Sequence, residues 1–357
     1  MDKYAVPLAF AGFAVSCVML PSALAGWTFG AIVDRFGARR VALVGLLLSA
    51  AASATAAADL SFVALVLVRV VEGTGYTLLV IAATVLVVQL APSQSALALS
   101  VWSSFAPIGF ALGQWGASYA AGAQPLLAVG LVHAVVLGCA ALALAALLHK
   151  DRPSKRAPFG AQVLRHSPAQ RTALAFGSSC AVLLASVALA PVVLAAKTGL
   201  GVAHVASLTA LAALPSIVGR IFPGWAMQRG IPSLALYLGS AVIAAASLAG
   251  SLLAPLPLAG ALMLFAMFQI SAGALPGILS AMMPHVAPAP EQLGAVSGMC
   301  SQLVNMGNLI GPPLALAVYA AVGTGAAVAV LIVLLGVSFA VLTPVPAYRR
   351  DLRSQAA

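Results

Sequence analysis

Long apolar runs recur from one end of this chain to the other, and they constrain its fold more than any other feature. Of the 357 residues, 62% are hydrophobic and only 7% are charged, whereas soluble domains carry about 25% charged residues. A chain with so little charge cannot cover the surface of a globule in water. In lipid, a spanning helix needs about 20 consecutive apolar residues. The sequence therefore predicts an all-α, polytopic membrane protein.

We expect eleven spanning helices, joined mostly by short connections. Their expected limits are 5–30, 41–58, 62–89, 97–121, 125–148, 171–195, 203–226, 233–253, 257–283, 294–321 and 324–343. The run after Lys3 continues unbroken past Ala23-Leu24-Ala25. We therefore interpret it as a retained helix and not as a cleaved signal peptide.

One longer connection divides the chain into two parts. Residues 149–170 contain several Arg and Lys residues together with prolines, which is typical of a linker. We expect a helical bundle of five helices over 1–148 and a second bundle of six helices over 171–343. A tail over 344–357 completes the chain.

The basic residues are distributed unequally between the two sides of the expected membrane. Thirteen Lys and Arg residues fall on one side, and only Lys3 and Lys197 fall on the other. Because basic loops face the cytoplasm, the linker and the C-terminus should be cytoplasmic and the N-terminus outside, in a bacterial inner membrane. This distribution explains the net charge of +10 without a nucleic-acid partner.

Three short patterns recur at a nearly constant offset. They are Gly30-x3-Asp34-Arg35 with Gly224-x3-Gln228-Arg229, Arg69-x3-Gly73 with Gln269-x3-Gly273, and Gly109-x3-Gly113 with Gly307-x3-Gly311. Their offsets of 194, 200 and 198 predict two parallel halves related by an axis along the membrane normal. A shift of the span 171–195 by 194 places its counterpart before Met1. We therefore expect the first half to lack the equivalent of that helix.

The same patterns resemble the signature motifs of the major facilitator superfamily (MFS). The segment Gly30-x3-Asp34-Arg35-x-Gly37-x-Arg39-Arg40 is similar to motif A, Arg69-x2-Glu72-Gly73-x-Gly75 to motif B, and Gly109-x3-Gly113 to a reduced motif C. The chain departs from the family at Glu72, where Gln is frequent, and motif C lacks its glycine-proline ending.

The resemblance implies a two-bundle fold that contains helices 2–6 and 7–12 of the family. It also implies a monomeric secondary transporter that moves a small organic solute across the lipid bilayer by alternating access. The driving force would be a gradient of the solute or of protons.

Motif A suggests a conformational latch. Asp34 and Arg35 lie where a helix meets the cytosol. A carboxylate there can face an Arg or the N-terminus of a helix from the other half, and so hold one conformation. The alternative is a plain basic loop that only sets the topology, which explains Arg39 and Arg40 but not Asp34 with its spaced glycines.

Arg69 and Glu72 are charged residues within an apolar span. They are three residues apart and so share a helix face, which Tyr76 continues. A charge at membrane depth costs about 2.5–3.5 kcal/mol unless it is paired or hydrated. Two interpretations remain open. The residues form a structural ion pair, or Arg69 attracts an anionic solute while Glu72 carries a coupling proton.

Further polar residues within the spans are candidates for solute contact or for bonds between helices. They are Gln114, His133, Gln269, Gln302 and Asn305. Another set of residues should allow close helix packing, because glycine has no side chain. This set comprises Gly73, Gly109, Gly113, Gly307 and Gly311.

Enzyme chemistry has no sequence support here. The chain has no zinc-binding His-Glu motif, no phosphate-binding loop and no nucleophile elbow. Its four cysteines lie in apolar runs without metal-type spacing, so we expect neither a metal nor a cofactor. The alternative to a transporter is a truncated or non-transporting membrane protein, kept as a sensor or as a degenerate gene product.

Overall fold

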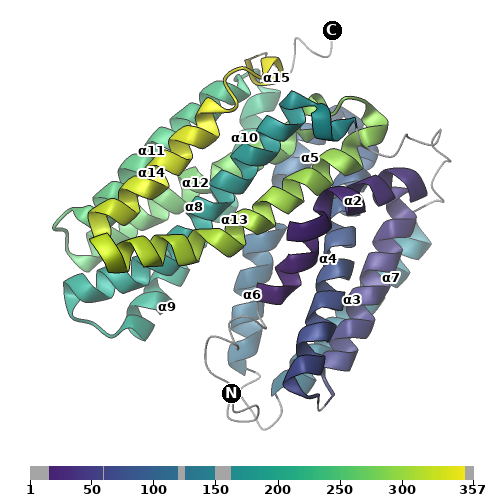
Figure 1. Cartoon of the computed structure of the whole chain (residues 1–357), viewed down its shortest axis with the longest axis horizontal. Coiled ribbons are helices and arrows are strands. Elements are labelled where there is room, and N and C mark those ends of the chain that lie inside the picture. Colours follow the sequence, from purple (N-terminus) through teal and green to yellow (C-terminus); the bar gives the residue numbers. More distant parts are fainter. Residues whose placement is uncertain (1–15, 59, 120–124, 149–161, 350–357) are drawn as a thin grey trace. The chain divides into compact units, whose positions relative to one another are not determined.

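The computed structural model describes residues 16–58, 60–119, 125–148 and 162–349, and within them the chain is helical and contains no strand (Figure 1). The α-helices are α2 (Leu20–Phe36), α3 (Ala38–Ala56), α4 (Phe62–Leu90), α5 (Ser95–Trp102), α6 (Phe105–Tyr119), α7 (Pro125–Leu147), α8 (Ser167–Thr198), α9 (Val202–Ala213), α10 (Ser216–Gln228), α11 (Ser233–Leu253), α12 (Leu258–Val286), α13 (Leu293–Val322), α14 (Thr324–Ala340) and α15 (Pro346–Arg349). Short 3₁₀ helices are η1 (Cys17–Met19), η2 (Pro92–Gln94), η3 (Val163–Arg165) and η4 (Pro290–Gln292).

The helices confirm the expected fold class of an all-α, polytopic membrane protein. In the described part of the chain, 10 helical segments are long and apolar enough to cross a membrane, and Thr324–Ala340 is a shorter apolar helix. Most helix bounds lie within a few residues of the expected limits, and α11 spans 233–253 as expected. The first span differs: it was expected over 5–30, whereas α2 covers Leu20–Phe36 and residues 1–15 lie outside the described part of the chain.

The basic segment 30–40 differs from the expected loop. Helix α2 continues through Asp34 and Arg35 to Phe36, and α3 begins at Ala38. Gly37 alone makes the turn, with a φ of 92°. Side chains rarely tolerate this backbone conformation, so the turn requires glycine.

Two expected spans are broken helices. The span 97–121 consists of α5 and α6, which are separated at Ser103 and Ser104. Pro107 has no N–H to donate to the carbonyl of Ser103 one turn earlier, which accounts for the break. The span 203–226 likewise consists of two helices, α9 and α10, which are separated at Leu214 and Pro215. Other prolines lie within continuous helices: Pro191, Pro276, Pro312 and Pro313.

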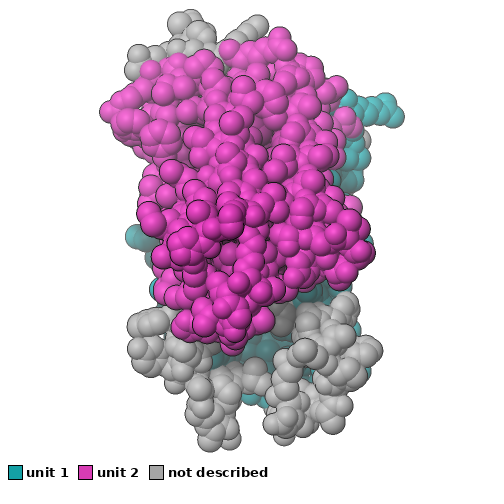
Figure 2. Space-filling model, turned by 90° about the vertical axis from the view of Figure 1, so that its left-hand side faces the viewer, with its two compact units in different colours: residues 1–89, 110–166, 287–305 teal, residues 90–109, 167–286, 306–357 magenta. Residues whose placement is uncertain are grey.

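The chain forms two compact units, which Figure 2 shows in different colours. Unit 1 comprises residues 1–89, 110–166 and 287–305, and unit 2 comprises residues 90–109, 167–286 and 306–357. Much of the expected linker lies outside the described residues. The expected division into halves at 149–170 stays a prediction.

Each unit has a buried core of its own. In unit 1, Val33 of α2 packs with Val41 of α3 and Ile81 of α4. In unit 2, Tyr237 of α11 is fully buried, and its hydroxyl donates to Ser338 Oγ of α14 at 2.9 Å. A buried Tyr hydroxyl with such a partner avoids the cost of an unsatisfied polar group.

Candidate functional site

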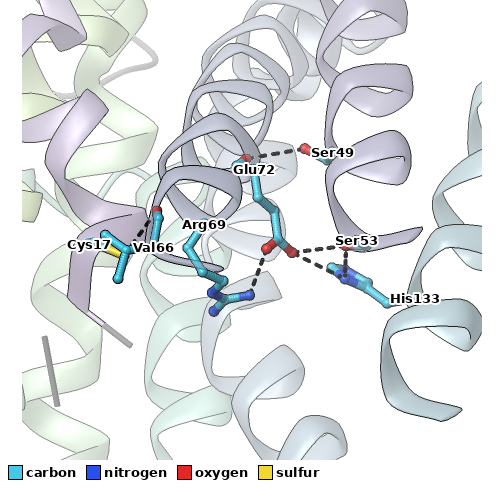
Figure 3. Close-up of polar contacts among 7 residues, drawn as sticks. All are labelled: Cys17, Ser49, Ser53, Val66, Arg69, Glu72 and His133. Atoms are coloured by element: carbon cyan, nitrogen blue, oxygen red, sulfur yellow. Dashed lines mark hydrogen bonds and ion pairs between the residues drawn. The ribbon is translucent and has the colours of Figure 1, made fainter. Parts of the chain in front are cut away.

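A buried carboxylate lies within the spanning part of unit 1. The side chain of Glu72, on α4, is only 7% exposed. Its Oε2 atom lies 2.6 Å from Nη1 of Arg69, and its Oε1 atom accepts a hydrogen bond from Ser53 Oγ of α3 at 2.9 Å (Figure 3). The two oxygens therefore have different partners, one of them a cation and the other a neutral hydroxyl.

His133 of α7 extends this cluster. Its Nδ1 atom lies 2.9 Å from Ser53 Oγ and 3.5 Å from Oε1 of Glu72. Ser53 has a single hydroxyl proton and donates it to Glu72, so Nδ1 of His133 must be the donor to Ser53. The His133 side chain is 51% exposed. A continuous path of hydrogen bonds thus connects an exposed imidazole to a buried carboxylate (Figure 3).

Glycines allow the helices around Glu72 to approach each other. A Cβ atom on Gly75 of α4 would lie 2.7 Å from the carbonyl oxygen of Gly45 on α3. A Cβ atom on Gly130 of α7 would lie 2.9 Å from the carbonyl oxygen of Ser53. These distances are shorter than any ordinary Cβ contact, so a larger residue would push α3 away from its neighbours.

The backbone of α4 is held from two sides near the ion pair. Ser49 of α3 donates to the carbonyl of Glu72 at 3.3 Å, and the thiol of Cys17 in η1 contacts the carbonyl of Val66 at 3.9 Å. Gly73 packs closely against the carbonyl of Val18. The position of Glu72 is therefore fixed by several elements and not by α4 alone.

A second carboxylate, that of Asp34, lies at the start of α13. Its Oδ1 and Oδ2 atoms accept hydrogen bonds from the backbone N–H groups of Gly294 and Ala295, each at 2.7 Å. These N–H groups belong to the first turn of α13, where they have no partner within the helix. The carboxylate satisfies both donors and lies at the positive end of the helix dipole.

Four glycines allow α2 and α13 to come this close. A Cβ atom on Gly30 would collide with the carbonyl of Gly294, and one on Gly298 would collide with the carbonyl of Gly26. Both helices therefore present glycines four residues apart to each other. This spacing is typical of closely packed membrane helices.

The arginines of the motif A-like segment have separate contacts. Nη2 of Arg39 donates to the carbonyl of Ala145 at 2.8 Å, close to the end of α7. A cation there complements the negative end of that helix. The guanidinium of Arg35 lies 5.7 Å from the centre of the Phe36 ring. Arg35 and Arg40 are exposed.

Gln302 and Asn305 connect α13 to a distorted part of α2. Ala25 departs from helical geometry, with φ −136° and ψ 19°. Beside it, the side chain of Gln302 accepts from the N–H of Trp27 at 3.2 Å and donates to the carbonyl of Leu24 at 3.3 Å. Nδ2 of Asn305 contributes a further bond to Ser22 Oγ at 3.0 Å. The sequence left solute contact and bonds between helices open for Gln302 and Asn305. The contacts observed here are bonds between helices.

The remaining polar candidates have different surroundings. Gln269 of α12 is 2% exposed, and its Nε2 atom has no hydrogen-bond partner among the described residues. Tyr76 is 41% exposed although it lies one turn from the buried Glu72. The side chain of Gln114 lies outside the described part of the chain. Among the described residues, no group of His, Cys, Asp and Glu side chains could hold a metal ion.

The expected packing glycines also divide into two groups. Gly307 packs closely against the carbonyl of Gly177, and a Cβ atom on Gly311 would lie 2.6 Å from the carbonyl oxygen of Ala181 on α8. A Cβ atom on Gly109 or Gly113 would meet no described atom within 4 Å. Close packing therefore has structural support at the second pair and none at the first.

Sequence reasoning missed several residues of these sites. Ser53 is one turn from Ser49 on an apolar helix, and that spacing could have indicated a shared polar face. The pairs Gly26-x3-Gly30 and Gly294-x3-Gly298 could likewise have indicated helix contacts. In unit 2, Nη1 of Arg220 donates to the carbonyl of Ser103 at 2.8 Å, and no short motif pointed to this contact.

Comparisons with known proteins agree with this architecture. The family model described as Major Facilitator Superfamily matches residues 1–299. No curated protein sequence matches the chain.

Several solved structures share the fold. The human organic anion transporter MFSD10 (TETRAN) has a TM-score of 0.77 and 20% identity, over 93% of this chain and 83% of that one. A variant of the Escherichia coli fucose:proton symporter FucP also has a TM-score of 0.77, with 17% identity over 94% of this chain and 90% of the symporter. FucP in the outward conformation has a TM-score of 0.73 and 17% identity, over 96% of this chain and 91% of that one. The family match and the fold together show that the chain belongs to the major facilitator superfamily of membrane transporters.

Proposed function

We propose that this protein is a secondary active transporter that moves a small organic solute by alternating access, and that Glu72 carries a coupling proton. The observation that carries the proposal is the burial of this carboxylate within a spanning helix, where its side chain is 7% exposed. Ionisable residues inside a membrane are expensive and generally mark solute or proton pathways. A proton symporter is among the proteins that share this fold.

The surroundings of Glu72 suit a carboxylate that gains and loses a proton. In the charged form it has the Arg69 cation and the Ser53 hydroxyl as partners. After protonation, Ser53 and His133 can still provide hydrogen-bond partners for the neutral acid. Both forms therefore have polar contacts within the same cluster.

The contact of Asp34 with α13 supports a conformational latch as part of the same function. The contact consists of two short hydrogen bonds and a favourable charge–dipole interaction. A transporter that changes conformation must break such a contact and form it again. Gly37 and Arg39 fix the turn and the neighbouring helix end beside it.

The proposal can be tested with purified protein in proteoliposomes that contain a pH-sensitive dye. We expect an external solute from a panel of sugars, amino acids and carboxylates to acidify the lumen. Glu72→Gln should abolish the solute-dependent acidification while the variant stays folded by thermal unfolding. Lys197→Gln removes an exposed charge at the end of α8, and this variant should transport normally.

If Glu72→Gln still couples solute to protons, Glu72 is not the carrier. If no solute moves, the non-transporting alternative is favoured.

A further inference from the structure

The Arg69–Glu72 pair is asymmetric in its exposure. The Arg69 side chain is 33% exposed and that of Glu72 is 7% exposed. The cation is thus the accessible partner, and the carboxylate lies behind it. Nη1 of Arg69 contacts Oε2 of Glu72, and Oε1 accepts the hydrogen bond of Ser53 (Figure 3).

The charge of the pair depends on one proton. When Glu72 is ionised, the two residues are neutral together and offer no net attraction to an anion. When Glu72 is protonated, Arg69 keeps a full positive charge at membrane depth, which is unfavourable unless an anion compensates it. A carboxylate suits this role, because the planar guanidinium binds it through two parallel hydrogen bonds.

We infer that the transported solute is an organic monocarboxylate whose carboxylate replaces Glu72 as the partner of Arg69 when Glu72 takes up a proton. The inference rests on the proposed function and adds the class of solute and the stoichiometry. One proton accompanies one monovalent anion, so transport is electroneutral.

The hydrogen-bond path supplies the proton. Nε2 of the exposed His133 imidazole takes a proton from water, and Nδ1 gives its own proton to Ser53 Oγ while the Ser53 hydroxyl proton passes to Oε1 of Glu72. The proton gained at Nε2 balances the one lost at Nδ1, so the imidazole is neutral before and after the transfer. Glu72 becomes neutral, its contact with Nη1 of Arg69 weakens, and the carboxylate of the solute takes over that donor.

Among the described residues, the neighbouring elements contribute no second carboxylate to the cluster. The groups that face Glu72 are Arg69 on α4, Ser49 and Ser53 on α3, and His133 on α7. The thiol of Cys17 in η1 contacts α4 one turn away. Glu72 is therefore the carboxylic acid in this cluster, and its protonation removes the negative charge next to Arg69.

The test compares carboxylates with their neutral amides. Purified protein in detergent is mixed with gluconate, lactate, nicotinate or benzoate, and separately with the corresponding amides, and its thermal unfolding is followed at pH 5.5 and 7.5. Ligand binding raises the apparent stability by mass action. We expect at least one acid, but not its amide, to raise the unfolding temperature, and to do so more at pH 5.5. Uptake of one proton per ligand corresponds to a change of up to about tenfold in Kd per pH unit.

Variants assign the effect to the proposed residues. In Glu72→Gln, which imitates the protonated acid, the acid should bind equally at both pH values. Arg69→Gln should lose binding, and Lys197→Gln should behave as the parent protein. His133→Ala should retain the pH dependence at equilibrium, because His133 only delivers the proton.

Several results would overturn the inference. These are equal stabilisation by the amides, stronger binding at pH 7.5, pH dependence that survives in Glu72→Gln, or no binding by any of the acids. A failure of this inference can be distinguished from a failure of the proposed function. A neutral solute that drives proton movement in proteoliposomes would support proton coupling and still exclude this assignment of the solute.

Discussion

At the scale of single residues, Gln302 shows how one side chain can bind two backbone groups beside a distortion in a helix. The N–H of Trp27 and the carbonyl of Leu24 lie on either side of Ala25, where the backbone departs from helical geometry. The amide of Gln302 satisfies both, since it offers an acceptor and a donor on the same planar group. Backbone groups within a membrane must be satisfied inside the protein, so these two hydrogen bonds should stabilise the distorted turn.

Replacement of Gln302 by Leu should therefore destabilise the protein. Two hydrogen bonds of about 0.5–1.5 kcal/mol each are lost, and two backbone groups are left without this partner. We expect a lower unfolding temperature in detergent and faster hydrogen exchange at the amide of Trp27. Gln89→Leu is the matched control, because Gln89 is exposed at the end of α4 and its loss should change neither quantity. An unchanged exchange rate at Trp27 would contradict the assignment.

At the scale of helices, Gly298 of α13 and Gly109 of α6 should respond differently to replacement by Ala. Gly298→Ala places a methyl group against the carbonyl of Gly26, and overpacking of this kind costs about 1–3 kcal/mol. Gly109→Ala adds a methyl group where no described atom lies within 4 Å. It should be neutral or stabilise α6 by up to about 1 kcal/mol. Thermal unfolding of both variants checks the contrast, and equal effects would show that α2 and α13 do not pack in this way.

The break between α5 and α6 predicts an energetic coupling between two residues. Pro107 cannot donate to the carbonyl of Ser103, and Arg220 donates to it at 2.8 Å instead. Arg220→Gln should therefore destabilise the protein less in a Pro107→Ala background, where the N–H of residue 107 is restored. We expect a coupling energy of about 0.5–3 kcal/mol in a double-mutant cycle of unfolding free energies. Additive effects would mean that Arg220 does not compensate for the proline.

The helices were predictable to a large extent, because a membrane span is recognised by length and apolarity alone. The breaks at Ser103 and before Ser216 were not predictable, since most of the prolines in the spans leave their helices continuous. In the site, Arg69 and Glu72 were expected to share a face because they are three residues apart. The contacts of Glu72 with Ser53 and His133 join three helices. No periodicity identifies such partners when every helix is apolar all round.

At the scale of the whole molecule, the distribution of basic residues predicts the orientation in the membrane. Single cysteines at positions 39 and 197, introduced into a variant without the four native cysteines, would lie on opposite sides. We expect an impermeant maleimide to label Lys197→Cys in intact cells and Arg39→Cys only after permeabilisation. The opposite pattern would invert the orientation. It would also place the proposed latch at Asp34 on the outer side.

The latch itself predicts a change in the balance between conformations. Asp34→Asn keeps one acceptor oxygen but removes the charge at the N-terminus of α13, an interaction of up to about 2 kcal/mol in partly buried sites. A change of 1–2 kcal/mol corresponds to a factor of about 5–30 in an equilibrium. The conformation in which Asp34 has left the first turn of α13 should therefore become markedly more populated. Hydrogen exchange at Gly294 and Ala295 should then accelerate. Glu291→Gln controls for the loss of an exposed acid two residues before the same helix, and it should leave exchange unchanged. If Asp34→Asn also leaves exchange unchanged, the charge of Asp34 does not stabilise its contact with α13, and the proposed latch is contradicted.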